Sequence, residues 1–190
     1  MTKATDRHPH SLALDGGALG SLQFVWRGDR YCHSWSCGSG SARQVLLESI
    51  ESDSSALWPI SPPLQQIHQQ EFDDGREVIF GVGMSGRGHW SASFTLIPDL
   101  NCWIVELACR SPLIPELLSC AYQLSGPWSS TGNGVWQQCL GQRTIRIEPI
   151  APSSQGTEMA PGALQIRPTN LPTSGPSTTQ WAYRLKWSNA

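Results

Sequence analysis

The sequence predicts an all-β fold, an antiparallel two-sheet sandwich of roughly ten strands with long proline-rich crossing loops. Almost every ordered-looking segment alternates apolar and polar residues with a period of two, as a strand with one buried face does. No window sustains helical spacing over three turns, and 14 prolines and 18 glycines separate the segments. The alternative is a closed lipocalin-like barrel. We favour the sandwich because long proline-rich excursions suit crossings between stacked sheets.

Length and charge limit the domain organisation and the partners. The 190 residues predict a flexible N-terminal segment at 1–18 and a single all-β domain at 19–190. Thirteen basic residues against fifteen acidic ones create no long-range field for nucleic acid or a membrane surface. No segment approaches the ~20 apolar residues of a membrane span. We expect a cytoplasmic protein with neither nucleic acid nor membrane as a partner, and the oligomeric state stays open.

The first hairpin is predicted from the stretch VWRGDRYCHSW at 25–35. Gly28-Asp29 suits a two-residue type II′ loop, because glycine takes the first central position. The resulting register places aromatic and aliphatic residues on one face, so Arg27-Gly28-Asp29 is interpreted as a hairpin tip and not as an adhesive motif. His33 is expected in the core with a satisfied hydrogen bond. The pairs on this face are Trp26 with Tyr31, Phe24 with His33, and Leu22 with Trp35.

The string GVGMSG at 81–86 matches the dinucleotide-binding pattern G-x-G-x-x-G. That pattern needs a helix after the glycines, so that the helix N-terminus meets the pyrophosphate. Here the alternating stretch HWSASFTLI follows, which predicts a strand. We therefore expect a turn at Ser85 to Gly88, with Gly83 facing Trp90 and Gly81 facing Ala92. The two glycines are expected to give the bulky indole room.

The same strand is predicted to continue into a hairpin through Pro98 to Asn101, four residues that favour turns. Its inner face is assigned to the core. The expected core pairs are Leu96 with Trp103, Phe94 with Val105, Ala92 with Leu107, and Trp90 with Cys109.

The rest of the chain carries weaker signals. An Asn133-Gly134 turn precedes a hairpin that pairs Trp136 with Ile147 and Gln138 with Ile145. Residues 149–179 predict a proline-, serine- and threonine-rich surface excursion, and 180–187 a final core strand. A proline-rich crossing at 52–66 is expected to pack through Leu57 and Trp58. Two weak helical candidates are Ala42 to Glu51 and Pro115 to Tyr122, of which the second fits a strand equally well.

No cofactor, metal ligand or catalytic residue is predicted. The six cysteines include no Cys-x-x-Cys pair, so we expect buried, reduced thiols. The chain has no Gly-x-Ser-x-Gly elbow, His-Glu-x-x-His helix or phosphate-binding loop.

The candidate site is a sheet face that combines an apolar floor with a few polar groups, a composition typical of small-ligand pockets. We expect a non-catalytic binding protein for a small polar or anionic, sugar-like ligand, with Trp58 or Trp128 as further contacts. One alternative is an enzyme with Glu106 and His89 as an acid/base pair. Another is a structural subunit that assembles through aromatic-rich sheet surfaces. The predicted ligand-binding residues are Met84, Arg87, His89, Ser91, Ser93, Glu106 and Arg110.

Overall fold

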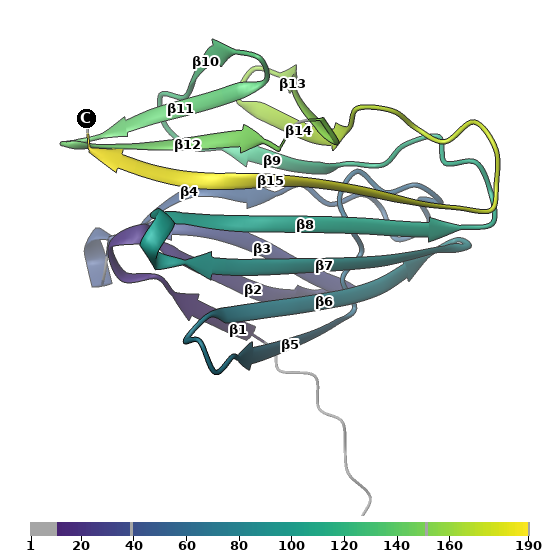
Figure 1. Cartoon of the computed structure of the whole chain (residues 1–190), viewed down its shortest axis with the longest axis horizontal. Helices are drawn as coiled ribbons and strands as arrows, with labels where there is room; N and C mark the ends of the chain where they lie inside the picture. Colours follow the sequence, from purple (N-terminus) through teal and green to yellow (C-terminus); the bar gives the residue numbers. More distant parts are fainter. Residues whose placement is uncertain (1–10, 39, 151, 190) are drawn as a thin grey trace, which may run out of the picture.

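The computed structural model describes residues 11–38, 40–150 and 152–189. Within these ranges, fifteen strands form two antiparallel sheets that lie face to face and are not closed into a barrel (Figure 1). The predicted sandwich is confirmed, with more strands than expected. The helical segments of the described residues are three short 3-10 turns, at Gly17–Leu19, Gly40–Ala42 and Pro98–Leu100. None of the described residues form a helix with the length and apolar character that crossing a bilayer requires.

Sheet A has the strand order β1-β2-β3-β4-β9-β14-β13. It contains β1 (Ser11–Asp15), β2 (Ser21–Arg27), β3 (Arg30–Cys37), β4 (Gln44–Ser49), β9 (Cys120–Leu124), β13 (Ser154–Ala160) and β14 (Ala163–Pro168).

Sheet B has the strand order β10-β11-β12-β15-β8-β7-β6-β5. The last strand of the chain, β15, lies between β8 and β12 in the middle of this sheet (Figure 1). Sheet B contains β5 (Gln66–Glu71), β6 (Glu77–Ser85), β7 (Gly88–Ile97), β8 (Cys102–Ser111), β10 (Ser129–Gly132), β11 (Val135–Leu140), β12 (Arg143–Pro149) and β15 (Ser177–Asn189).

The predicted hairpin registers are confirmed. Gly28 has φ +68° and Trp26 pairs with Tyr31, as the two-residue loop requires. The Arg-Gly-Asp tripeptide forms the hairpin tip, where Arg27 pairs with Glu48 at 3.0 Å. In sheet B the register of β7 and β8 and that of β11 and β12 agree residue by residue with the expected pairs. Asn133 and Gly134 both have positive φ, as an Asn-Gly turn requires.

The core lies between the sheets and is rich in aromatic residues. Trp90 and Trp103 are 2% and 0% exposed, which confirms that the alternating tryptophans point inward. Phe94 of sheet B meets Phe24 and His33 of sheet A edge-on, with ring centroids 5.0 and 5.1 Å apart. Such edge-to-face contacts stabilise the sandwich beyond the burial of apolar area.

The explanation expected for the glycines of β6 is wrong. Gly83 does pair with Trp90, and Gly86 and Arg87 form the turn. However, a Cβ on Gly83 would lie 1.7 Å from the Pro63 carbonyl oxygen. The glycines therefore make room for the proline-rich crossing and not for the indole. The crossing joins the two sheets, because the Leu64 carbonyl accepts a hydrogen bond from Tyr31 N at 2.7 Å.

Several weakly patterned segments also differ from the expectation. Residues 11–15, expected in the flexible segment at 1–18, form β1, which pairs with β2 and buries Leu14. Residues 1–10 lie outside the described residues. The first helical candidate, Ala42 to Glu51, contains β4, and the second ends in β9. In these segments tertiary pairing overrides weak local propensity.

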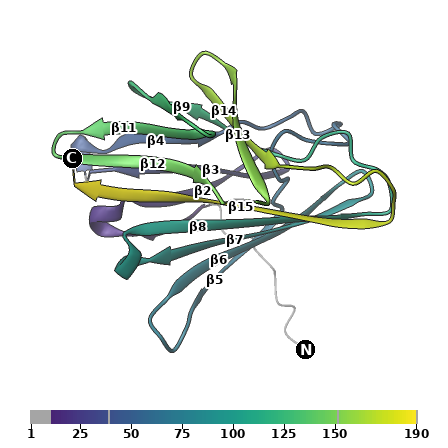
Figure 2. The same cartoon turned by 45° about the horizontal axis from the view of Figure 1, so that its top comes forward.

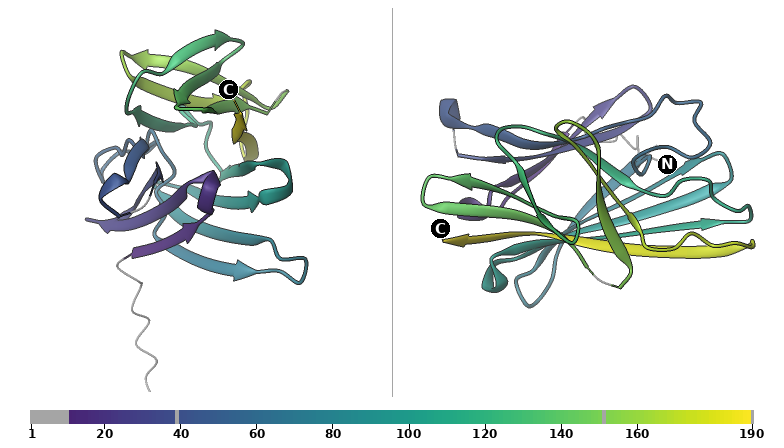
Figure 3. Two further views of the ribbon diagram at one scale, coloured as in Figure 1. Left: turned by 90° about the vertical axis from the view of Figure 1, so that its left-hand side faces the viewer. Right: turned by 90° about the horizontal axis from the view of Figure 1, so that it is seen from above.

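The excursion at 149–179 contains a hairpin at 154–168. Its strands β13 and β14 extend sheet A, because β14 pairs with β9. The hairpin lies at the same end of the molecule as β10 to β12 (Figures 2 and 3), where a Cβ on Gly134 would meet the backbone of Gly156 at 2.7 Å. The predicted final strand at 180–187 lies within β15, and its four large apolar side chains are buried.

Candidate functional site

The outer face of sheet B brings together part of the predicted site. Ser93 of β7 pairs with Phe80 of β6 on one side and with Glu106 of β8 on the other. Paired residues of antiparallel strands point to the same face. Two residues along each strand, Ser91 forms a second row with Val82 and Ala108. These two rows form the centre of the face.

Met84, His89 and Arg110 form a third row, next to Ser91. Met84 is 48% exposed, and its backbone N and carbonyl are hydrogen-bonded by the side chain of Gln65. Arg87 lies in the turn between β6 and β7. The predicted site is therefore one continuous stretch of sheet surface, in which the charged groups Arg87 and Arg110 lie toward one end.

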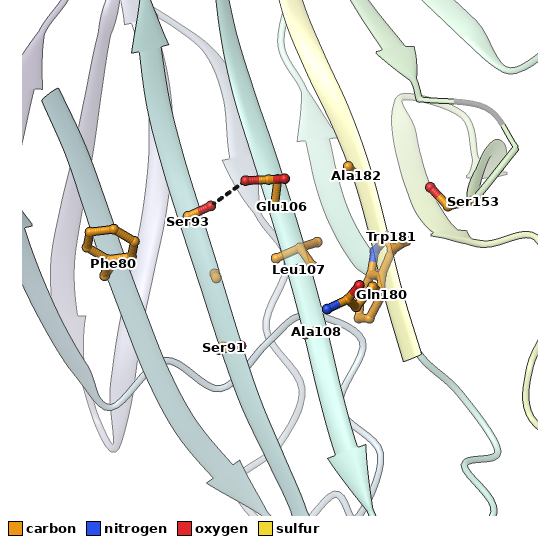
Figure 4. A pocket seen from close by; sticks show the side chains of 11 residues that line it. Phe80, Ser91, Ser93, Glu106, Leu107, Ala108, Ser153, Gln180, Trp181 and Ala182 are labelled. Atoms are coloured by element: carbon orange, nitrogen blue, oxygen red, sulfur yellow. Dashed lines mark hydrogen bonds between the residues drawn. The ribbon is translucent and has the colours of Figure 1, made fainter. Parts of the chain in front are cut away.

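The first two rows, apart from Val82, line a hollow of about 550 Å³, within the range of small-molecule sites. We call it the outer hollow (Figure 4). Its lining residues are Phe80, Ser91, Ala92, Ser93, Glu106, Leu107, Ala108, Ser153, Gln180, Trp181 and Ala182.

The hollow exists because small side chains occupy its floor. Ser91, Ser93 and Ala108, with Ala182 of β15, lie between two borders. One border is the Phe80 ring, which is 38% exposed, and the other is the loop that carries Ser153 (Figure 4). Leu107 and Trp181 are 3% and 1% exposed and belong to the core, so a ligand would meet the outward-facing residues.

The polar groups of the hollow comprise hydroxyls, a carboxylate and an amide. Ser93 Oγ donates a hydrogen bond to Glu106 Oε2 at 3.2 Å. The other carboxylate oxygen of Glu106 and the Gln180 amide are available to a ligand at the same face (Figure 4). Both residues are exposed, so binding would require a ligand that replaces their water contacts.

The structure does not bring His89 and Glu106 together. His89 is four residues along β7 from Ser93, the partner of Glu106. At ~3.3 Å per residue the two side chains originate about 13 Å apart along the sheet. Direct proton exchange requires hydrogen-bond distance, so this geometry does not support the acid/base pair.

Sequence reasoning missed two polar lining residues, and the tryptophans that it suggested as further contacts do not line the hollow. Gln180 reaches the hollow only because β15 pairs with β8, and Ser153 only because the loop before β13 passes β15. Neither long-range contact leaves a local pattern. Trp58 and Trp128 are partly buried against the core, and Trp128 Nε1 donates to the Ser125 carbonyl at 3.1 Å. The exposed ring at the hollow is Phe80.

The cysteines are free in the structure, and burial raises the pKa of Cys120 to about 12 and that of Cys109 to about 11. Among the described residues, no group of three or more His, Cys, Asp and Glu side chains could hold a metal ion. No protein-family model matches this chain, and no curated protein matches it in sequence. Any function has to be argued from the residues themselves.

Proposed function

We propose that this protein is a non-catalytic binding protein that holds a small polar, sugar-like ligand in the outer hollow. The observation that carries the proposal is the combination of an exposed ring with hydrogen-bonding groups around a floor of small side chains. The ring is Phe80, and the polar groups include Ser93, Glu106 and Gln180.

A sugar ring matches both the exposed aromatic ring and the hydrogen-bonding groups. Its apolar C–H face stacks on an aromatic ring, while its hydroxyls both donate and accept hydrogen bonds. The available carboxylate oxygen of Glu106 accepts a hydrogen bond from a sugar hydroxyl, and the Gln180 amide both donates and accepts. The small residues of the floor leave the sheet flat enough for a ring to lie against it. A purely apolar ligand would remove water from the other carboxylate oxygen of Glu106 without replacing its hydrogen bonds, which costs free energy.

Binding of a panel of mono- and disaccharides, organic acids and nucleotides, followed by thermal shift and then calorimetry, tests the proposal. For a sugar that binds, Glu106→Gln should weaken binding about tenfold, since a hydrogen bond to a neutral acceptor contributes ~1 to 1.5 kcal/mol less than one to a charged group. Phe80→Ser should weaken it about threefold to tenfold through the lost stacking.

Glu158→Gln and Val45→Ser are the matched controls. Glu158 is an exposed carboxylate of β13, and Val45 is a 40% exposed apolar residue of β4, both in sheet A. These variants should bind as the wild type does. Equal losses in the controls and in the site variants, or no sugar that binds at all, would refute the proposal.

The outward row of β6 favours assembly as a second candidate. Phe80, Val82 and Met84 are 38%, 46% and 48% exposed and follow one another along the strand. Contiguous apolar surface of this kind often marks an interaction site. Light scattering after size exclusion distinguishes the candidates: a dimer of the wild type that dissociates in Val82→Ser/Met84→Ser supports assembly, and a monomer in both supports ligand binding.

A further inference from the structure

A second crevice lies on sheet A, at the tip of the β2–β3 hairpin and beside the end of β4. Its volume is about 320 Å³, at the lower end of the range of small-molecule sites. It is separate from the outer hollow and shares no lining residue with it. The crevice is lined by Arg27, Asp29, Arg30, Cys32, Ser49, Glu51 and Ser52.

Arg30 contributes a buried donor that has no acceptor. The side chain is 4% exposed, and its Nε and Nη2 each donate to one carboxylate oxygen of Asp29 at 2.9 Å. Its third nitrogen, Nη1, is buried and has no hydrogen-bond partner among the described residues. A buried donor without an acceptor destabilises the protein, and more so when it is charged. A ligand that supplies the acceptor would recover that free energy.

Glu51 contributes a second unpartnered atom to the same crevice. Its Oε1 accepts a hydrogen bond from Ser49 Oγ at 2.7 Å, and that hydroxyl in turn accepts from the backbone N of His33 at 3.0 Å. Its Oε2 is buried and has no partner in the described part of the chain. Burial raises the pKa of Glu51 to about 7, against the lowering effects of the Ser49 hydrogen bond and the Arg30 charge. Because Oε1 already accepts the hydrogen bond from Ser49, the proton of the neutral Glu51 carboxyl group belongs on Oε2.

The other charged groups around the crevice largely balance one another. Arg27 pairs with Glu48, and Arg30 pairs with Asp29. Burial raises the pKa of the Cys32 thiol to about 11, so it stays neutral, and burial keeps His33 neutral by lowering its pKa to about 3. The exposed carboxylate of Asp53 accepts hydrogen bonds from Ser55, which lower its pKa. Glu51 is the lining group whose charge changes near neutral pH.

We propose that this crevice is a binding site for a carboxylate, whose oxygens accept hydrogen bonds from Arg30 Nη1 and from the protonated Glu51 Oε2. An ionised Glu51 would oppose the ligand, because two carboxylates would then share one partly buried site. The ligand therefore binds together with a proton that Glu51 takes up from solvent. The proposal is independent of the sugar-binding function of the outer hollow, since the two sites share no residue.

Calorimetric titration of the full chain with acetate and propionate at pH 6 and pH 8, in a chloride-free buffer, tests this coupling. Only the fraction of protein with protonated Glu51 binds, so affinity at pH 6 should exceed that at pH 8 about tenfold. Acetamide, the neutral analogue of acetate, should bind at least tenfold more weakly at pH 6. Glu51→Gln keeps a donor without a titrating group, so its acetate affinity should be the same at both pH values.

Arg30→Gln should abolish binding, and its far-ultraviolet circular dichroism shows whether the fold survives. If it does not, Glu51→Gln still decides the case. The control Glu158→Gln should keep the tenfold pH effect. An acetylated tripeptide with a free or an amidated C-terminus distinguishes the source of the carboxylate: tighter binding of the free peptide than of acetate indicates a chain terminus, and the reverse a free acid.

Three results would overturn the proposal. They are acetamide binding as tightly as acetate, a wild-type affinity that does not change between pH 6 and pH 8, and the absence of saturable binding by any carboxylate, which would leave water as the occupant.

Discussion

The substitution His33→Gln should change the pH dependence of stability in a defined direction. His33 Nε2 lies 2.6 Å from Tyr122 Oη, and burial lowers the pKa of His33 from 6.5 to about 3. The stability that its neutral form contributes is present above pH 6.5 and is lost as the pH falls toward 3. Between pH 7 and pH 5 this loss amounts to about 2 kcal/mol of the free energy of unfolding. Glutamine keeps a hydrogen-bonding group but does not titrate, so the variant lacks this loss.

Glu51 has the opposite effect over the same interval. Its pKa is raised from 4.5 to about 7, so its contribution is present below pH 4.5 and lost as the pH rises through 7. Between pH 7 and pH 5 it should add up to about 2 kcal/mol. The two terms nearly cancel in the wild type. His33→Gln should therefore become more stable from pH 7 to pH 5, and Glu51→Gln less stable, each by up to about 2 kcal/mol.

Urea unfolding at constant ionic strength, followed by tryptophan fluorescence and by circular dichroism, measures these changes. Agreement of the two probes checks that unfolding is two-state. The measured quantity is the change in the free energy of unfolding between pH 7 and pH 5. The loss of the aromatic contacts of His33 lowers stability at both pH values and does not affect this difference. If His33→Gln and the wild type change alike between pH 7 and pH 5, within about 0.5 kcal/mol, the histidine is not held neutral and the reasoning fails.

Two further predictions concern the strands themselves. Truncation after Gln180 should unfold the protein, because it removes four side chains that are at most 4% exposed and contribute about 6 to 12 kcal/mol together; an unshifted cooperative melt of the truncated chain would contradict this. Gly83→Ala should destabilise by about 1 to 3 kcal/mol or more, since its Cβ meets the backbone of Pro63. Gly81→Ala should cost less in the same urea titration, because the atoms nearest to its Cβ are those of the Leu64 side chain, at 2.9 Å or more, and not backbone; equal costs would show that the crossing adjusts freely.

Local patterns in the sequence determined the hairpins. The two-residue loop at Gly28-Asp29 and the Pro98–Asn101 connection each specify a register, and a register determines which side chains share a face. The sequence alone therefore places Ser93 and Glu106 on one surface. The same logic placed His33 in the core, because its pairing partner Phe24 is apolar.

The tertiary structure determined the contacts between segments that do not belong to the same hairpin. The pairing of β15 with β8 brings Gln180 to the outer hollow, and the crossing that contains Pro63 explains the glycines of β6. The unpartnered atoms of Arg30 and Glu51 depend on the packing of the β2–β3 hairpin against the end of β4. Contacts between distant segments arise from the summed burial of many side chains, so no short stretch of sequence encodes them.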